Sequence, residues 1–266
     1  HLTHGFGDRA IFSDVSFRLL KGEHIGLVGA NGEGKSTFMN IITGKMMPDE
    51  GKVEWAKNVR VGYLDQHTVL EKGMTIRDVL KSAFSWLYEM EERMNTICDS
   101  MGDASEDELN AMMEELGVIQ EMMDAHDFYI LDSRIEEIGR ALGLEEIGLE
   151  RDVTELSGGQ RQRLVVAAVL AEEPKVLVFD EPTSALDPEG IHEFYEMVGE
   201  LNQKEKLTVV VAEHHLEATL PYAKRFILMD KGHVISDGSP EQVMRDMKRN
   251  HIYEEAIPDI YLSLIH

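Results

Sequence analysis

A glycine-rich run between an apolar segment and a helical pattern constrains the fold of this chain more than any other feature. The run GANGEGKST follows the apolar residues 25–28 and precedes a helical pattern that begins near Thr37. It fits GxxxxGK[ST], in which a strand leads into a loop whose backbone amides bind phosphate at the start of a helix. This order of elements predicts an α/β fold with a phosphate site at the end of a strand.

Lys35 and Ser36 give this loop its chemistry. We expect the loop amides and Lys35 to bind the phosphates of a nucleotide, and the Ser36 hydroxyl to ligate Mg²⁺. A chance match is the alternative, expected in roughly one random chain in a hundred of this length. The candidate nucleotide-binding residues of the loop are Gly29, Asn31, Gly32, Gly34, Lys35, Ser36 and Thr37.

Two acidic residues end a second apolar run, KVLVFDEP. At the carboxyl end of a buried strand, Asp180 would hold Mg²⁺ through water, and Glu181 would polarise the water that attacks the γ-phosphate. Acidic residues at a strand end more often form a solvated turn. The phosphate loop upstream reverses that expectation and favours ATP hydrolysis.

The run LSGGQRQR, residues 156–163, is the most specific pattern in the chain. Ser157, Gly158 and Gly159 would leave amides and a hydroxyl at a helix N-terminus, which is a second anion site unless the serine only caps the helix. The run resembles the signature of the ATP-binding cassette (ABC) family. This resemblance implies that these residues and Gln160 close over the nucleotide of a second cassette, in a homodimer or a heterodimer of ABC domains.

Four further positions match the same family. Gln66 resembles the Q-loop glutamine that contacts Mg²⁺ and the attacking water, and His214 resembles the histidine that contacts the γ-phosphate. Phe6 fits the aromatic residue that stacks on adenine, and Asp187 ends the D-loop that crosses between cassettes. A structural histidine and a core phenylalanine are the alternatives. The predicted catalytic residues are Lys35, Gln66, Glu181 and His214, and the predicted magnesium ligands are Ser36, Gln66 and Asp180.

The resemblance and the order of elements together predict a P-loop NTPase fold of the ABC type, with a mainly parallel core sheet, an antiparallel β part and an inserted α-helical subdomain. We expect residues 1–66 and 157–266 to form the nucleotide-binding core. Residues 67–156 would form the insertion, with a helical hairpin at about 82–133. Seven methionines are expected to fill the seam of this hairpin, namely Met90, Met94, Met101, Met112, Met113, Met122 and Met123.

Short local patterns predict individual boundaries. Capping boxes at Ser105 with Glu108 and at Ser133 with Glu136 predict helix starts, and Gly143 is expected to end a helix. Strands are expected at 14–20, 51–55, 59–64, 176–179, 208–212 and 226–229, and helices from Gly159 and Pro188.

The two halves of the chain resemble different ABC subfamilies. Residues 1–160, with FGDRAIF and a long helical insertion, resemble the first cassette of ABC-F proteins, which are ribosome-associated translation factors. Residues 157–266, with DEPTSALDPEG and FILMDKGHVISDGSPEQV, resemble importer ATPases of the energy-coupling-factor (ECF) type. The second resemblance implies a transmembrane partner subunit and the first implies the ribosome. We favour the importer because the catalytic half resembles it.

Charge and apolar content limit the partners. The formal net charge of −24 argues against direct DNA binding, and residues 81–133 alone hold fourteen acidic and two basic residues. Cys98 is the only cysteine, so no intrachain disulfide can form. The single cysteine predicts a reducing cytoplasm as the location. No apolar run reaches the roughly 20 residues of a membrane span, so a partner would supply any span and this protein would bind peripherally at the inner face of the cell membrane.

Overall fold

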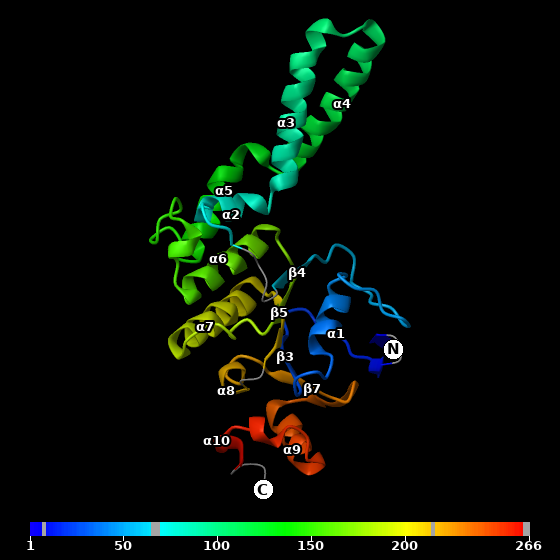
Figure 1. The fold of residues 1–266 in the computed structure, drawn as a ribbon, viewed down its shortest axis with the longest axis vertical. Helices are drawn as coiled ribbons and strands as arrows, with labels where there is room; N and C mark the ends of the chain where they lie inside the picture. Colours follow the sequence, from blue (N-terminus) through cyan, green and yellow to red (C-terminus); the bar gives the residue numbers. More distant parts are fainter. Residues whose placement is uncertain (7–8, 65–69, 214–215, 263–266) are drawn as a thin grey trace.

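Among the described residues, a six-stranded sheet forms the centre of the molecule (Figure 1). The computed structural model describes residues 1–6, 9–64, 70–213 and 216–262. The strands of the central sheet are β3 (His24–Val28), β4 (Val61–Leu64), β5 (Val176–Asp180), β6 (Thr208–Ala212), β7 (Arg225–Asp230) and β8 (His233–Gly238).

The strands follow the spatial order β4-β5-β6-β3-β7-β8, and every neighbouring pair is parallel except β7 with β8. A separate antiparallel pair is formed by β1 (Leu2–Phe6) and β2 (Arg9–Val15). The predicted α/β class, with a mainly parallel sheet and an antiparallel part, is therefore confirmed.

Both faces of the central strands are buried, which explains why these strands are continuous apolar runs. In β5, Leu177 and Phe179 belong to one hydrophobic core, while Val176 and Val178 belong to another on the opposite face. The same alternation recurs in β6. Because successive strand side chains point to opposite faces, each face needs its own cover of helices.

Among the described residues, the structure contains ten helices, some of which cover the two faces of the sheet (Figure 1). They are α1 (Lys35–Ile42), α2 (Ile76–Ser82), α3 (Ser85–Ser100), α4 (Glu106–Ala125), α5 (Leu131–Ala141), α6 (Gly158–Ala171), α7 (Pro188–Glu205), α8 (Leu216–Thr219), α9 (Pro240–Asn250) and α10 (Asp259–Leu262), with short 3-10 turns at 101–103, 128–130, 153–155 and 254–256. α1 and the β1–β2 pair cover one face, around Phe12 and Phe38. α2, α5, α6 and α7 cover the other, around Leu80, Ile135 and Leu164.

Side-chain capping explains the starts of α2, α4, α6, α7 and α9. Ser105 and Glu108 form the predicted capping box of α4, and the Ser105 amide donates to Glu108 Oε2 at 2.9 Å. The prediction of a second box at Ser133 is wrong. α5 begins two residues earlier, at Leu131, because the 3-10 turn at 128–130 runs directly into it and the Leu131 side chain is buried.

Two predicted strands differ from the structure. Residues 14–20 hold only the end of β2 and a loop. Residues 51–55 form no described strand, and Trp55 instead donates its indole N–H to the carbonyl of Ile42 at 3.0 Å, which packs the segment against α1. Gly143, with φ at +68°, follows the end of α5 as expected for a helix stop.

The hairpin of α3 and α4 projects away from the sheet (Figure 1). Its seam buries Ile97, Ile119 and Met123. Five of the seven methionines predicted for the seam pack there, namely Met90, Met94, Met101, Met112 and Met123. Met113 and Met122 are exposed instead, because each adjoins a seam methionine in sequence and a helix turns neighbouring side chains about 100° apart.

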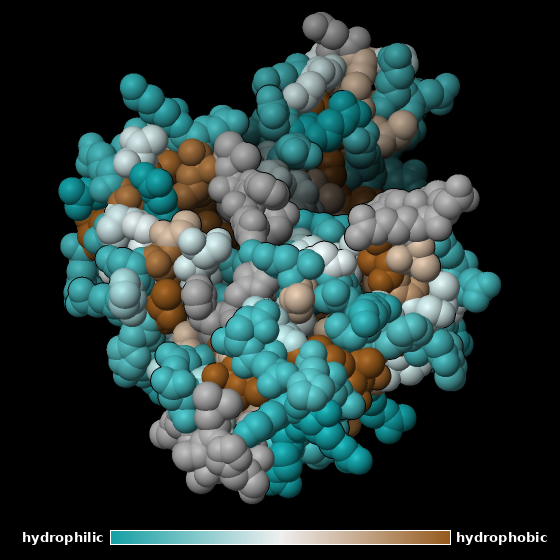
Figure 2. Space-filling model, turned by 60° about the horizontal axis from the view of Figure 1, so that its bottom comes forward, coloured by the Kyte–Doolittle hydropathy of each residue, from teal (hydrophilic) through white to brown (hydrophobic). Residues whose placement is uncertain are grey.

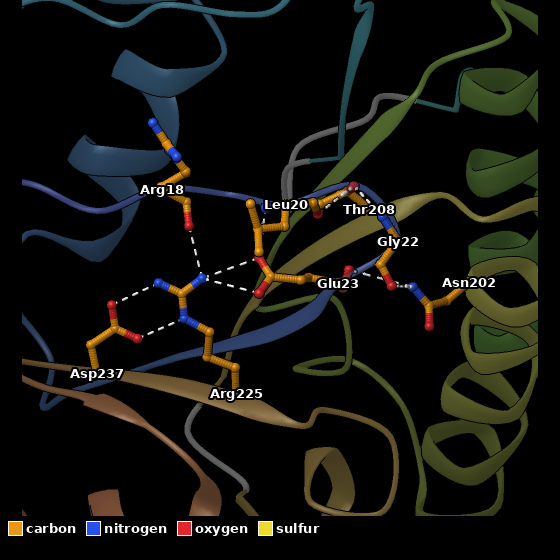
Figure 3. Close-up of polar contacts among 8 residues, drawn as sticks. All are labelled: Arg18, Leu20, Gly22, Glu23, Asn202, Thr208, Arg225 and Asp237. Carbon is orange, nitrogen blue, oxygen red and sulfur yellow. Dashed lines mark hydrogen bonds and ion pairs between the residues drawn. The ribbon is translucent and has the colours of Figure 1, made fainter.

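A polar network holds the loop between β2 and β3 at the amino-terminal edge of the sheet (Figure 3). The Asn202 side-chain amide donates to the carbonyls of Gly22 at 3.0 Å and Leu207 at 2.7 Å. The Thr208 hydroxyl accepts from the Gly22 amide at 3.0 Å and donates to the carbonyl of Leu20 at 3.2 Å. This edge is therefore fixed from both α7 and β6.

Hydrophilic side chains dominate the face shown in Figure 2, where hydrophobic side chains form separate patches. Exposed apolar residues such as Leu20, Met47 and Tyr129 lie on different parts of the chain. Within the described ranges, no helix combines the length and the apolar character needed to cross a membrane.

Candidate functional site

The phosphate loop joins β3 to α1, and close packing requires two of its glycines. A Cβ on Gly29 would lie 2.4 Å from the carbonyl oxygen of Met229 in β7. Gly34 is the N-cap of α1 with φ at +90°, and a Cβ there would lie 2.8 Å from Cγ2 of Ile11. The loop is thus held close against β2 and β7. The first turn of α1 contains no acidic residue, so the helix N-terminus is suited to an anion.

Lys35 is buried within this loop. Its ammonium group donates hydrogen bonds to the carbonyls of Gly29 at 2.7 Å and Ala30 at 3.0 Å. Burial lowers the pKa of Lys35, and nearby negative charges oppose that effect. These charges belong, in decreasing order of effect, to Glu181, Asp180, Glu33 and Glu213. The loop thus holds a cation that phosphate oxygens could bind by exchanging for the two carbonyls.

The two acidic residues at the end of β5 differ in environment. Asp180 is the last residue of the strand and is buried. Glu181 follows with φ at +48°, in the left-handed region that costs a residue with a side chain about 1–3 kcal/mol. Its amide donates to the carbonyl of Ala212 at 2.9 Å, which ties the turn to β6. The strained backbone directs the chain sharply away from the strand at this residue.

Glu181 and the phosphate loop line one cavity of about 250 Å³. The cavity brings together six predicted loop residues and one predicted catalytic carboxyl group. Its lining consists of Ile11, Asn31, Gly32, Gly34, Lys35, Ser36, Thr37 and Glu181. Hydroxyl and carboxyl groups at such a site are the oxygen ligands that Mg²⁺ prefers, so the residues present fit a magnesium nucleotide. Among the described residues, no group of three or more His, Cys, Asp or Glu side chains is arranged to hold a metal ion by itself.

The signature run starts α6 and lies elsewhere. Ser157 is the N-cap, where its hydroxyl accepts from the Gln160 amide at 3.2 Å and its amide donates to Gln160 Oε1 at 3.0 Å. A Cβ on Gly158 would lie 3.3 Å from Cδ2 of Leu186 in the D-loop. In the described part of the chain, residues 157–160 do not line the cavity beside Lys35. This serine does cap its helix, and the anion-binding role of the run remains a prediction.

Asp187 ends the D-loop and caps the next helix. Its carboxylate accepts from the Gly190 amide at 2.8 Å at the start of α7. The D-loop therefore lies between two helix starts, that of α6 and that of α7. Three predicted site positions cannot be placed: Gln66, His214 and the side chain of Phe6 lie outside the described residues.

Two residues of this region were missed by sequence reasoning. Ile11 lines the cavity through a contact between β2 and the start of α1, and no local pattern marks such a long-range contact. Glu213 is buried directly after the apolar strand β6. An acidic residue that continues a buried strand is a usable signal, because an isolated buried carboxyl group is costly and needs hydrogen bonds.

The profile of the ABC transporter family matches residues 12–184, which contain the phosphate loop, the signature run and the two acidic residues of β5. The chain belongs to this family. It is an ABC ATPase cassette, a member of a family whose members bind and hydrolyse ATP.

Relatives of this ABC cassette differ in how much of the chain they share. The uncharacterized ABC transporter ATP-binding protein YfmM of Bacillus subtilis is 68% identical over 190 residues, which is 71% of this chain and 37% of the relative. A putative ABC transporter ATP-binding protein of Pyrococcus abyssi is 34% identical over 249 residues, covering 91% of this chain and 80% of the relative. The energy-coupling factor transporter ATP-binding protein EcfA2 of Ligilactobacillus salivarius is 31% identical over 247 residues, covering 90% and 76%.

Solved structures support the fold of the cassette. A nucleotide-free ATP-binding cassette from an ABC transporter aligns with a TM-score of 0.69 at 23% identity and covers 97% of both chains. The dimeric bacterial ABC transporter cassette MJ0796 aligns with a TM-score of 0.61 at 23% identity, covering 90% of this chain and 96% of that one.

Proposed function

We propose that this ABC cassette binds and hydrolyses Mg-ATP as a dimer and thereby energises a membrane importer through a transmembrane subunit. The single observation that carries the proposal is the cavity shared by Lys35, Ser36 and Glu181 at the start of α1. It combines an anion-binding helix start, a buried cation and a carboxyl group that can orient water.

ATP would bind with its phosphates at the amides of α1, where Lys35 exchanges its two carbonyl ligands for phosphate oxygens. Ser36, Asp180 and Gln66 are the proposed ligands of Mg²⁺, which when bound screens the charge of the phosphates. The Phe6 side chain is proposed to stack on adenine. Lys35 then stabilises the negative charge that develops during hydrolysis.

Glu181 is the proposed general base. Glu181 lines the cavity beside Lys35, where its carboxyl group would orient a water next to the γ-phosphate. Glu181 would accept a proton from that water as the water oxygen attacks the γ-phosphorus, while the bond from the γ-phosphorus to the bridging oxygen breaks and ADP leaves. His214 is proposed to contact the γ-phosphate. The positive φ of Glu181 supports this role, because residues with strained backbone conformations are often found at active sites.

The signature residues are proposed to act in a second cassette. Residues 157–160 do not line the cavity of their own chain, which supports a role at the nucleotide of another ABC domain. Ser157, Gly158, Gly159 and Gln160 of one cassette would then close over the ATP of the other, and Asp187 would lie between them. One phosphate loop in this chain requires a homodimer or a heterodimer to form two such sites.

The importer role is supported by relatives named as ECF transporter ATP-binding proteins, which align over most of their own length. In this proposal the core comprises residues 1–66 and 157–266, and residues 67–156 form the inserted helical subdomain. The protein would be cytoplasmic and peripheral at the inner face of the membrane. The transmembrane subunit would supply the membrane span.

A second candidate function is that of an ABC-F translation factor or a fragment of one. The observation that favours it is the α3–α4 hairpin, which projects from the cassette within the proposed hairpin region 82–133 (Figure 1). The acidic character of this region is unfavourable for close contact with ribosomal RNA, though not for contact with basic proteins.

Glu181→Gln tests the function and separates the two candidates. We expect this variant to retain ATP binding, to lose at least about a hundredfold in turnover, and to accumulate as a dimer with ATP. Unchanged turnover would contradict the role of Glu181. Glu189→Gln, an exposed change in the first turn of α7, is the matched control.

The trapped variant is then sedimented from cells containing ATP. Recovery with membranes supports the importer, and recovery with ribosomes instead supports the ABC-F candidate. The same experiment on a variant whose residues 85–125 are replaced by a short linker shows whether the hairpin determines the partner.

A further inference from the structure

Glu213 is a buried acidic residue that follows four apolar residues of β6. It follows Ala212, the last residue of β6, and is only 4% exposed. Its backbone amide donates to the carbonyl of Leu27 in β3 at 3.5 Å, just before the phosphate loop. Its charge also acts on Lys35, whose pKa it helps to raise against the effect of burial. Glu213 therefore lies at the reacting edge of the sheet.

The carboxyl group of Glu213 accepts two hydrogen bonds from Thr183. The Thr183 hydroxyl donates to Glu213 Oε1, and the Thr183 amide donates to the same oxygen at 3.3 Å. The Tyr195 hydroxyl of α7 accepts from the Thr219 hydroxyl of α8 at 3.0 Å, and the charge of Glu213 acts on that hydroxyl. Burial, with a smaller effect from Glu213, raises the pKa of Tyr195 well above its usual value, so that hydroxyl remains a donor.

Glu213 and the three side chains around it are all buried. Thr183 is 2% exposed, and Tyr195 and Thr219 are each 1% exposed. Buried hydrogen bonds of this kind polarise one another and hold a single arrangement, and removing one member leaves the others unsatisfied. The network is therefore expected to be rigid.

Thr183 connects this network to the turn that begins at Glu181. This residue lies two positions after Glu181 and immediately before the D-loop, and its carbonyl accepts from the Leu186 amide at 3.0 Å. The Ser184 amide in turn donates to the Glu181 carbonyl at 3.3 Å. A shift of Thr183 would thus move both the strained backbone of Glu181 and the segment that borders the signature helix.

We propose that Glu213 is a positioning residue for ATP hydrolysis, whose carboxyl group holds Thr183 and so fixes the Glu181 backbone and the D-loop at the reacting edge. This inference rests on the proposed hydrolytic function and deepens it. Glu213 does not touch the reacting atoms. It acts through Thr183, and α7 and α8 support it through Tyr195 and Thr219.

A role in positioning predicts a loss in kcat without a matching loss in ATP affinity. We expect Thr183→Val and Glu213→Ala each to lower kcat at least about tenfold, while the Kd for Mg-ATP stays within about threefold. Thr183→Ser keeps the hydroxyl donor and is expected to retain kcat within about twofold. Tyr195→Phe removes one hydroxyl from a folded core and is expected to lower kcat to an intermediate degree.

The matched control is Thr208→Val, which removes another buried hydroxyl at the opposite edge of the sheet (Figure 3). It is expected to lower the unfolding temperature while kcat stays at the wild-type value. The double variant of Glu213→Ala and Thr183→Val is expected to lose no more activity than the more affected single variant, because both changes break the same contact.

The measurements are steady-state turnover, calorimetric binding of Mg-ATP and thermal unfolding of the full chain. A folded Thr183→Val and a folded Tyr195→Phe with wild-type kcat would overturn the inference and leave the hydrolytic function standing. Wild-type protein that binds Mg-ATP without any turnover would overturn the hydrolytic function, and the inference with it.

Discussion

The Arg225 guanidinium donates two parallel hydrogen bonds to the Asp237 carboxylate, from Nε to Oδ1 at 2.6 Å and from Nη2 to Oδ2 at 2.7 Å (Figure 3). Its remaining nitrogen, Nη1, donates to the Glu23 carboxylate at 3.1 Å and to the carbonyl of Arg18 at 2.8 Å. One planar side chain thus joins β7, β8 and the loop before β3. Only a guanidinium has the fixed fork that satisfies all three directions.

Arg225→Lys is therefore expected to lower the free energy of unfolding by roughly 1–3 kcal/mol, since an ammonium group cannot keep the paired geometry. Urea unfolding monitored by circular dichroism measures the change. Lys204→Ala breaks an exposed pair with Glu200 on α7 and is expected to change stability by less than about 1 kcal/mol. Equal losses in the two variants would contradict the role of the fork.

His24 predicts a pH dependence of stability. It is buried at the start of β3, and burial lowers its pKa from 6.5 to about 4 in the folded chain. The unfolded chain binds the proton first as the pH falls, so the contribution of neutral His24 to stability is complete above pH 6.5 and is lost progressively towards pH 4. The total loss is on the order of 3 kcal/mol, at about 1.4 kcal/mol per pKa unit.

The comparison that isolates His24 is the difference in urea midpoints at pH 7 and pH 4.5. His24→Phe is expected to show a smaller difference than the wild type, because it removes the titrating group. His192→Gln, an exposed histidine of α7, should retain the wild-type difference. If the His24→Phe protein keeps the full wild-type difference between the two urea midpoints, the pH dependence of stability arises from other groups.

Lys35 is expected to increase the affinity for ATP without stabilising the nucleotide-free protein. Folding buries its ammonium group, which lowers the pKa of Lys35, and the nearby carboxylates oppose that effect only in part. Lys35→Met is expected to weaken ATP binding roughly 10- to 150-fold, with no decrease in the unfolding temperature of the nucleotide-free protein. Lys52→Ala, an exposed lysine paired with Glu54, should change neither quantity. A large drop in the unfolding temperature of Lys35→Met would assign Lys35 a structural role instead.

Local patterns predicted the fold well where a short segment decides its own structure. The apolar run before the phosphate loop forms β3, and Ser105 and Glu108 of the first capping box cap α4. The box at Ser133 failed because α5 already starts at Leu131, whose side chain is buried. Residues 51–55 failed because their apolar side chains pack on α1 rather than in a ladder.

The site shows the same division. Lys35 and Glu181 were predicted from two separate runs, and parallel strands bring their ends together in one cavity. Ile11 and Glu213 could not be predicted with equal ease, because their roles depend on contacts between segments distant in the sequence. Packing, rather than propensity, determines those contacts.

The hairpin offers a test of its seam with two methionines of the same helix. Met123 is fully buried between α3 and α4, whereas Met113 is 60% exposed ten residues earlier. Met123→Ala is expected to destabilise the hairpin by roughly 2–4 kcal/mol, through lost burial and a cavity. Met113→Ala should change it by less than about 0.5 kcal/mol. Amide hydrogen exchange of residues 85–125 reads this directly, because protection there reports local opening. If exchange accelerates in the hairpin while the sheet remains protected, the hairpin opens as a unit separate from the cassette core; acceleration throughout the chain would mean that the seam also supports the ATP site.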